Sequence, residues 1–407
     1  MNTDLNRRGL LRGALAAGAA AATGSWASLA MGGTAAPDTP RLVAVILRGG
    51  MDGLWTVPAI GDPGFAAARG ALAQYPGAPL ALEGPFALHP GFAQLHSMWG
   101  RKELVVVHAA GLPYRDRSHF DAQNVLEGGG ERPYQVATGW LGRALAAGGQ
   151  PGLALSTTVP LLMRGPKEID TWAPSALPEP SPDLVARLAK VYANDPALSG
   201  ALMRAQGLRT DMPNTAEMMA IAANPGGGKN ASGSLPVMTR KAAEFMLQPK
   251  APQIIMLEQG GWDSHANLTN DKSAFLTNLR QLDESLGLLR EMLSAPQANG
   301  LWNRTVVVVA TEFGREVAIN GTRGTDHGTG GVAFVLGGAV RGGRMLADWP
   351  GLAPKDRYEG RDLKTTTDLR AVFKGVLADH LRVARGPLDK DVFPGTGGMK
   401  LPELIKA

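Results

Sequence analysis

Carboxylates and histidines gather in two loops of this sequence, and each loop follows an apolar run, at 254–257 and 305–310. Carboxylate oxygens and imidazole nitrogens are the ligands that proteins offer to zinc and similar divalent cations. The chain contains no cysteine, which excludes a thiolate site. The two loops therefore predict a metal site built from aspartate, glutamate and histidine. The candidate ligands are Asp263, His265, Glu312, Asp326 and His327.

Asp52 follows another apolar run, at 42–47, and stands between Gly50 and Gly53. A carboxylate flanked by glycines at the end of a strand can approach a bound ion closely. The same Asp-Gly pattern is also common in ordinary turns. Asp52 is therefore a candidate metal ligand with a structural alternative.

Ser118 follows a fourth apolar run, at 104–108. Ser118 and Asp121 have the spacing of a capping box, which predicts that Ser118 begins a helix over 118–127. A serine hydroxyl at a helix N-terminus also lies where backbone amides stabilise an anion, such as an attacked phosphoryl or sulfuryl group. Ser118 can therefore serve as a helix cap or as a nucleophile.

The apolar runs also predict the framework that brings these loops together. They show no alternation of polar and apolar residues, as expected of strands covered on both faces. Helical patterns lie between them, including a long one at 275–292. In a mostly parallel sheet the carboxyl ends of the strands lie along one edge, where ligands bind. We therefore expect an α/β fold in which the four loops meet at one site.

Residues 160–250 differ in character from the rest of the chain. Four prolines lie within 173–182, and 224–234 is rich in glycine. Amphipathic helical patterns lie between these stretches. We interpret this region as a helical cap or insertion within a single domain that covers 41–407.

The composition limits the classes of protein to consider. The chain has 407 residues, 44% apolar side chains and 53 glycines, which suits an α/β protein with many turns. The formal charge is +5, but the basic residues are scattered and form no stripe for a phosphate backbone. We therefore expect no nucleic-acid partner.

The first 30 residues have the pattern of a twin-arginine export signal. Arg7 and Arg8 precede an alanine- and glycine-rich run at 13–30, which ends in small residues suited to a signal peptidase. A membrane anchor is the alternative, but the low hydrophobicity of the run favours cleavage. We expect export to the periplasm or secretion by the twin-arginine translocase, a flexible start of the mature chain at 31–40, and no stable membrane insertion after cleavage.

Several motifs together resemble an exported family, the domain-of-unknown-function family numbered 1501. The resemblance covers nearly all of the mature chain and implies the fold of the alkaline phosphatase and sulfatase superfamily. That fold is a three-layer α/β/α sandwich with a metal site at the strand ends. Besides the twin-arginine start, the motifs are Arg48-Gly49-Gly50-Met51-Asp52-Gly53-Leu54, Arg117-Ser118-His119-Phe120-Asp121-Ala122-Gln123, Gly261-Trp262-Asp263-Ser264-His265-Ala266, Thr311-Glu312-Phe313-Gly314-Arg315 and Gly324-Thr325-Asp326-His327-Gly328.

The resemblance implies roles for individual residues. Asp52 matches the first-strand aspartate of the superfamily, and Ser118 matches its nucleophile. One metal position would be formed by Asp263, His265 and His327. A second would be formed by Asp52 and Glu312, with His119 or Asp326 replacing an imidazole, because Phe313 stands where the superfamily commonly has a histidine.

These residues suggest a metal-dependent hydrolase that acts on small anionic esters of phosphate or sulfate. Ser118 would attack, while Arg117 or Arg315 would neutralise the oxygens of the transferred group. Zinc is the first candidate for the metal, with calcium or magnesium as alternatives. The competing hypothesis is an exported metal- or partner-binding protein that has lost catalysis. A serine esterase is disfavoured because Ser118 lacks the flanking glycines of a nucleophile elbow.

Overall fold

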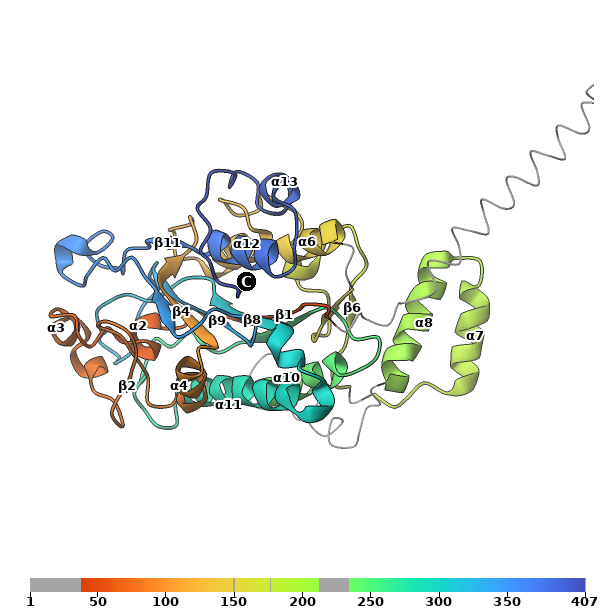
Figure 1. The fold of residues 1–407 in the computed structure, drawn as a ribbon, viewed down its shortest axis with the longest axis horizontal. Coiled ribbons are helices and arrows are strands. Elements are labelled where there is room, and N and C mark those ends of the chain that lie inside the picture. The colour runs from red at the N-terminus through yellow and green to blue at the C-terminus, as the bar shows by residue number, and fades with distance from the viewer. Residues whose placement is uncertain (1–37, 149–150, 176, 212–233, 407) are drawn as a thin grey trace, which may run out of the picture.

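The computed structural model describes residues 38–148, 151–175, 177–211 and 234–406 (Figure 1). The predicted export signal at 1–30 lies outside the described residues, as does most of the predicted flexible start at 31–40. Among the helices that are described, none is both long and apolar enough to cross a membrane.

A nine-stranded sheet forms the centre of the protein, in the order β10-β4-β9-β8-β1-β7-β5-β6, with β11 also paired to β4. All neighbouring pairs are parallel except those of β9, which runs antiparallel to both β4 and β8. A separate hairpin joins β2 (Leu80–Ala81) to β3 (Ala87–Leu88). The strands of the sheet are β1 (Arg41–Leu47), β4 (Leu104–Gly111), β5 (Gly152–Ala154), β6 (Asp170–Thr171), β7 (Ile254–Gln259), β8 (Thr305–Thr311), β9 (Gly331–Leu336), β10 (Arg344–Leu346) and β11 (Thr367–Asp368).

Helices cover both faces of the sheet, which makes the fold a three-layer α/β/α sandwich (Figure 1). Helices α4, α10 and α11 pack on one face, and α5, α6 and α12 pack on the other. The helices are α2 (Gly53–Thr56), α3 (Phe65–Arg69), α4 (Ala93–Gly100), α5 (His119–Gly128), α6 (Trp140–Gly148), α7 (Pro182–Tyr192), α8 (Pro196–Asp211), α10 (Leu235–Met246), α11 (Ala274–Ser294), α12 (Leu369–Asp379) and α13 (Arg385–Pro387).

Strand β1 shows why the apolar runs carry no alternation. Its odd-numbered residues from Val43 to Leu47 point into one core, and its even-numbered residues from Leu42 to Ile46 point into the other. Every residue of the strand is buried. The predicted α/β class with a mostly parallel, doubly covered sheet is therefore confirmed.

The register of the sheet places the ends of the central strands side by side. Leu47 at the end of β1 pairs with Gln259 of β7 and with Thr311 of β8. Strand β4 runs in the same direction, because two antiparallel pairings separate it from β8. The loops after β1, β4, β7 and β8 thus leave the sheet at one edge, as the sequence predicted.

The region 160–250 contains α7 and α8, which lie side by side at one end of the molecule (Figure 1), and α10, which packs on the core. The amphipathic pattern predicted α7 correctly as a helix. None of its residues is buried, however, and Val191 is 74% exposed. Its apolar face is only partly covered, since Val185 and Leu188 are half-buried while Leu184 is 41% exposed.

Candidate metal centre

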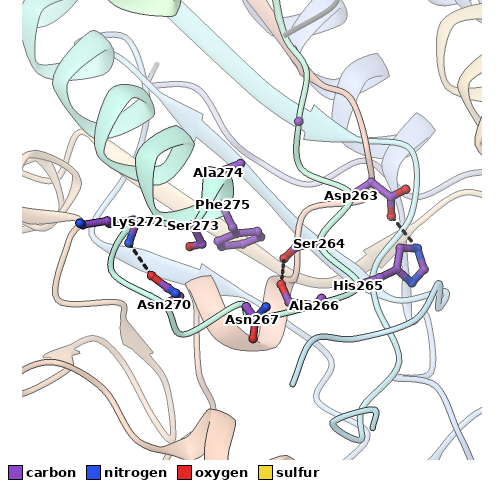
Figure 2. Close-up of a pocket in the computed structure, with 11 residues that line it drawn as sticks. Asp263, Ser264, His265, Ala266, Asn267, Asn270, Lys272, Ser273, Ala274 and Phe275 are labelled. Carbon is purple, nitrogen blue, oxygen red and sulfur yellow. Dashed lines mark hydrogen bonds and ion pairs between the residues drawn. The ribbon is translucent and has the colours of Figure 1, made fainter. Parts of the chain in front are cut away.

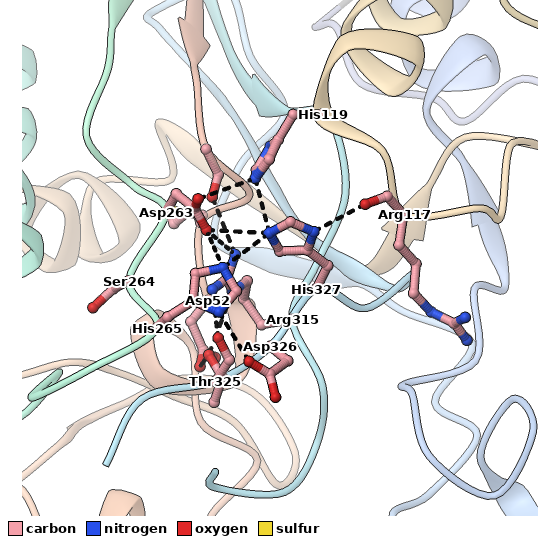
Figure 3. Close-up of polar contacts among 12 residues, drawn as sticks. Asp52, Arg117, His119, Asp263, Ser264, His265, Arg315, Thr325, Asp326 and His327 are labelled. Atoms are coloured by element: carbon pink, nitrogen blue, oxygen red, sulfur yellow. Dashed lines mark hydrogen bonds and ion pairs between the residues drawn. The ribbon is translucent and has the colours of Figure 1, made fainter. Parts of the chain in front are cut away.

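Four side chains converge at the carboxyl edge of the sheet (Figure 3). His119 is the first residue of α5, and Asp263 and His265 follow β7. His327 lies in the loop between β8 and β9. The structure thus brings the predicted Asp263, His265 and His327 together, and it joins to them His119, which was predicted for the second metal position.

The distances between these ligand atoms are short. His327 Nε2 lies 3.0 Å from His119 Nε2 and 3.0 Å from His265 Nε2. Asp263 Oδ1 lies 2.9 Å from His265 Nε2 and 3.3 Å from His327 Nε2, and its Oδ2 lies 3.4 Å from His119 Nε2. One small cation can therefore reach a carboxylate and several imidazoles at once. In particular, one ligand atom from each of His119, Asp263 and His327 lies within 4.8 Å of the others.

The other ring nitrogen of each histidine is held by an acceptor. His119 Nδ1 lies 2.7 Å from Glu312 Oε1, and His265 Nδ1 lies 2.9 Å from Asp326 Oδ1. His327 Nδ1 lies 2.9 Å from the backbone oxygen of Arg117. Carboxylate and carbonyl oxygens only accept hydrogen bonds, so each Nδ1 donates. The Nε2 atoms of His119 and His265 both face Nε2 of His327, and a neutral ring offers a lone pair there. Metal-binding histidines are commonly oriented in this way.

The electrostatics of the cluster favour a positive charge. Burial opposes protonation of His119, but hydrogen bonds to Asp263 and Glu312 raise the pKa of its imidazole to about 9. Burial also works against ionisation of Asp263, yet hydrogen bonds from His119, His327 and Arg315 lower the pKa of this carboxyl. Two imidazole nitrogens 3.0 Å apart can share a proton, or they can bind one cation. The ligand atoms of His119, Asp263 and His327, two imidazoles and one carboxylate, fit a divalent ion of the zinc type, and His265 lies beside them.

Glu312 and Asp326 were predicted as direct ligands, but the structure places them behind the histidines. Glu312 Oε1 accepts from His119, from the backbone N–H of Gly49 at 2.8 Å and from Gln123 Nε2 at 3.0 Å. Its Oε2 accepts from the hydroxyl of Thr311. Both oxygens are thus engaged, because this side chain is enclosed at the end of β8. Glu312 contacts the cluster through His119, and Asp326 contacts it through His265.

Asp52 also lies outside the converging set. Its Oδ2 forms a buried ion pair with Arg69 at 2.8 Å and accepts from the Thr325 hydroxyl. Its Oδ1 accepts from the backbone N–H of Trp55 and caps α2. The structural alternative that the sequence left open for Asp52 is therefore the arrangement observed.

We expected the guanidinium groups of Arg117 and Arg315 to face a substrate, but both form ion pairs with carboxylates of the protein. Arg117 pairs with Glu359 at 2.6 Å and with Asp362 at 2.8 Å, and its side chain points away from the cluster (Figure 3). Arg315 is almost fully buried and pairs with Asp263 Oδ1 at 2.7 Å. Arg117 therefore contributes its carbonyl, and Arg315 fixes the carboxylate of Asp263.

Ser118 occupies the N-cap position of α5 with extended backbone angles, and its carbonyl accepts from the N–H of Ala122. Its hydroxyl makes no capping hydrogen bond, contrary to the capping box that the sequence suggested. The hydroxyl lies near that of Tyr114, which itself donates to Asp121 Oδ2 at 3.3 Å. Ser118 and His119 are adjacent in sequence, but only His119 joins the cluster.

The glycine-rich loop after β8 owes its composition to close backbone packing. A Cβ on Gly324 would lie 2.2 Å from the carbonyl carbon of His265, and one on Gly328 would lie 2.4 Å from that of Arg315. Such contacts leave no room for a side chain. The glycines therefore let the loop that carries Asp326 and His327 lie against the loop that carries His265.

Comparison with known proteins identifies the family. The model of a family described as "Protein of unknown function (DUF1501)" matches residues 98–392. The chain belongs to this family. The resemblance that the motifs suggested is thereby confirmed, whereas no curated protein sequence matches the chain.

Solved structures similar to this DUF1501 protein are distant, and the three described here each have 12% sequence identity to it. A putative sulfatase from Bacteroides thetaiotaomicron has a TM-score of 0.39 and aligns with 85% of this chain and 71% of its own. The lipoteichoic acid synthase LtaP from Listeria monocytogenes has a TM-score of 0.35 and aligns with 77% of this chain and 68% of its own. The murine ectonucleotide pyrophosphatase/phosphodiesterase 5 has a TM-score of 0.33 and aligns with 67% of this chain and 57% of its own.

Two further side chains of this DUF1501 chain border the centre, and of these the sequence pointed only to Phe313. Gln123 bridges the centre to the rest of the sheet edge, since its amide donates to Glu312 and its oxygen accepts from Arg48 at 3.3 Å. Its position one helical turn after His119 could have revealed it. Phe313 packs against the rings of His119 and His327, with centroid distances of 4.7 and 5.2 Å. It forms an apolar wall where the resemblance led us to look for an imidazole.

Proposed function

We propose that this DUF1501 protein is an exported metal-dependent hydrolase of phosphate or sulfate esters. The observation that carries the proposal is the anchoring of three converging imidazoles, each through its Nδ1, around one carboxylate. His119, Asp263 and His327 would hold the ion, with His265 Nε2 beside them at 3.0 Å from His327 Nε2. A divalent cation bound there would supply Lewis acidity toward an ester oxygen and toward water.

The exposure of these residues favours catalysis over a purely structural metal. Structural zinc sites are closed, whereas catalytic sites keep a position open to water and substrate. The side chains of Asp263 and His265 are 41% and 44% exposed, and those of His119 and His327 are 21% and 26% exposed. An ester could therefore reach the centre from solvent.

The residues around the centre would fix its geometry during the reaction. Glu312 and Asp326 hold two imidazoles, and Arg315 holds the carboxylate of Asp263. Such preorganisation lowers the reorganisation needed as charge develops.

We assign the attack to water, because His119, and not its neighbour Ser118, contacts the other residues of the centre. The water oxygen bonds to phosphorus or sulfur and the ester bond breaks. One proton of the water goes to the leaving alcohol, and the other stays with the inorganic product.

Activity measurements with controlled metal content test the proposal. The purified mature chain is stripped with a chelator, reloaded with zinc, calcium or magnesium, and assayed with aryl phosphates and aryl sulfates while elemental analysis records occupancy. His327→Ala should lose both metal and turnover, whereas His96→Ala, at a histidine bonded to the carbonyl of Ala81, should keep both. Full occupancy without turnover of any ester would reject the hydrolase.

The second candidate is an exported protein that binds a metal or a partner without catalysis. Phe313 favours it, because an apolar ring lines the centre at a position where a second metal site would need an imidazole. Metal retention with no turnover in either the native chain or His96→Ala would support this candidate.

Export is proposed from the twin-arginine pattern alone. Replacement of Arg7 and Arg8 by lysine should retain the chain in the cytoplasm, where fractionation would detect it. A variant that is still exported would contradict the proposed route through the twin-arginine translocase.

A further inference from the structure

A cleft of about 420 Å³ opens beside the candidate metal centre (Figure 2). Asp263 and His265 form part of its wall, so the cleft and the centre share two residues. Asn267, Asn270 and Lys272 lie on the remaining wall, before α11. The volume is within the range of small-molecule sites. A substrate whose ester group lies at the centre would extend into this cleft.

The walls of the cleft are held in place without a ligand. The carbonyl of His265 accepts from Asn320 Nδ2 at 2.9 Å and from the Thr322 hydroxyl at 2.6 Å. The backbone N–H of Asn267 donates to the carbonyl of Thr322 at 3.0 Å. These bonds join the loop after β7 to the loop after β8. Preorganised walls reduce the entropy lost when a ligand binds.

The cleft contains one cation that is free to pair with a ligand. Lys272 is exposed, and within the described ranges no carboxylate forms an ion pair with it. The arginines of the neighbouring site are already paired, Arg315 with Asp263 and Arg117 with Glu359 and Asp362. Figure 2 shows the exposed Lys272 side chain directed away from Asp263 and His265, so an anion in the cleft would pair with Lys272, rather than with an arginine, once this side chain rotates inward.

The asparagine beside Lys272 adds donor groups of the right kind. Asn270 Oδ1 accepts from the backbone N–H of Lys272 at 2.9 Å, which fixes the orientation of its amide. Its amide N–H groups stay available to a ligand. Together, an ammonium group and an oriented amide suit an oxyanion better than an apolar group.

We propose that this cleft binds the leaving-group part of the substrate and that Lys272 pairs with a second anionic group there. The preferred substrates are then phosphate or sulfate esters whose alcohol carries a further carboxylate, sulfate or phosphate. This inference rests on the proposed function, because the ester itself would lie at the metal centre.

Calorimetric titration of the zinc-loaded chain provides a readout that does not depend on turnover. The probes are benzenesulfonate, with one anionic group, and 1,3-benzenedisulfonate and 4-sulfobenzoate, with two at different spacings. We expect at least one dianion to bind about tenfold more tightly than benzenesulfonate, which corresponds to ~1.4 kcal/mol. The difference should shrink at high salt, because the pair is exposed.

Lys272→Ala should abolish the tenfold preference, and Lys272→Arg should retain most of it. Lys400→Ala is the matched control, because Lys400 is exposed and lies outside the residues that line the cleft. Equal affinity of the native chain for all three probes would overturn the inference, as would a preference that survives Lys272→Ala.

A parallel assay separates failure of the inference from failure of the proposed function. Phenyl phosphate and 4-carboxyphenyl phosphate are compared by kcat/KM in the native chain and in Lys272→Ala. Turnover of both esters with no preference, alongside equal probe binding, contradicts the inference and leaves the hydrolase standing. A Lys272-dependent probe preference without turnover supports the cleft assignment and rejects the hydrolase.

Discussion

Each histidine of the centre is oriented by its own acceptor: two acceptors are carboxylates and the third is a backbone carbonyl. The two carboxylates differ in burial. Glu312 has no exposed side-chain surface, whereas Asp326 is 48% exposed. A buried carboxylate that accepts several hydrogen bonds constrains a neighbouring ring more strongly than a carboxylate that water can replace. The two carboxylates should therefore differ in their effect on metal affinity.

We predict that Glu312→Gln weakens metal binding by about 10- to 100-fold, the usual range for residues that orient a metal ligand. The glutamine amide would place an N–H group opposite groups that now donate to Glu312, among them His119 Nδ1, so one of these hydrogen bonds would be lost. Asp326→Asn should weaken binding less. Competition with a chromophoric chelator measures both constants. Glu403→Gln, in an exposed ion pair with Arg341, serves as the control and should bind metal as the native chain does.

Ser118→Ala distinguishes the two nucleophiles considered for the reaction. If water attacks, kcat should change by less than about threefold, because the lost hydroxyl contacts Tyr114 and not the cluster. A nucleophilic serine would instead cost several orders of magnitude on removal. Single-turnover measurements with an aryl phosphate decide the matter, and a collapse of kcat at unchanged metal content would restore Ser118 as the nucleophile.

Residue types and spacing were enough to predict the converging ligands but not the partners of the charged groups. Asp263, His265 and His327 follow strands whose ends are adjacent, so a parallel sheet brings them together. The buried ion pair between Asp52 and Arg69 was not predictable, because Arg69 belongs to a short helix whose position depends on tertiary packing. The same holds for the carboxylates that occupy Arg117.

Among the elements, the central strands were predictable because both of their faces are buried. Continuous apolar runs identify such strands whatever their neighbours are. The antiparallel direction of β9 left no such signal, since its sequence is as apolar as that of β8. Helix α7 shows the converse limit: its periodicity indicates a helix, but nothing in the pattern says what its apolar face contacts.

Strand β4 contains a buried histidine, His108, beside an irregularity of its backbone, and this histidine should make the stability of the fold depend on pH. The register shifts between His108 and Ala110, and Ala109 has φ of 51°. His108 Nε2 donates to the carbonyl of Val57 at 2.9 Å, and its Nδ1 accepts from the N–H of Ala109 at 2.8 Å. Protonation of Nδ1 would set two N–H groups against each other. Burial lowers the pKa of His108 to about 4, despite the bond to Val57.

The sign of this pH effect follows from proton binding. Between pH 6.5, the ordinary pKa of histidine, and pH 4, the unfolded chain binds a proton at this position and the folded chain does not. The free energy of unfolding should therefore fall as the pH falls through this window, by up to about 3 kcal/mol from His108. His89 adds in the same direction, because burial lowers its pKa to about 4 as well.

Urea unfolding at several pH values between 7 and 4 measures this contribution. His108→Gln should be less stable at pH 7. Its free energy of unfolding should fall less steeply toward pH 4, because unfolding of the variant takes up about one proton fewer. His96→Ala, at a histidine outside the core, should keep the native slope. Equal slopes for the native chain and His108→Gln would show that His108 does not titrate in this window.

At the scale of the whole molecule, the candidate centre joins segments that are far apart in sequence. His119 follows β4, Asp263 and His265 follow β7, and His327 follows β8. An ion held by all of them would act as a cross-link between the central strands, and binding to the folded state alone stabilises it by mass action.

We therefore predict that removal of the metal lowers the melting temperature by several degrees and that reloading restores it. At a free metal concentration 100 times the Kd, the stabilisation is about 2.7 kcal/mol, and it grows with concentration. Differential scanning calorimetry with and without chelator measures the difference. His327→Ala should show no response to either treatment, because its ring contacts both other histidines and Asp263. His96→Ala should respond as the native chain does. A His327→Ala protein that the metal still stabilises to the native extent would place the ion elsewhere, and with it the centre on which the hydrolase depends.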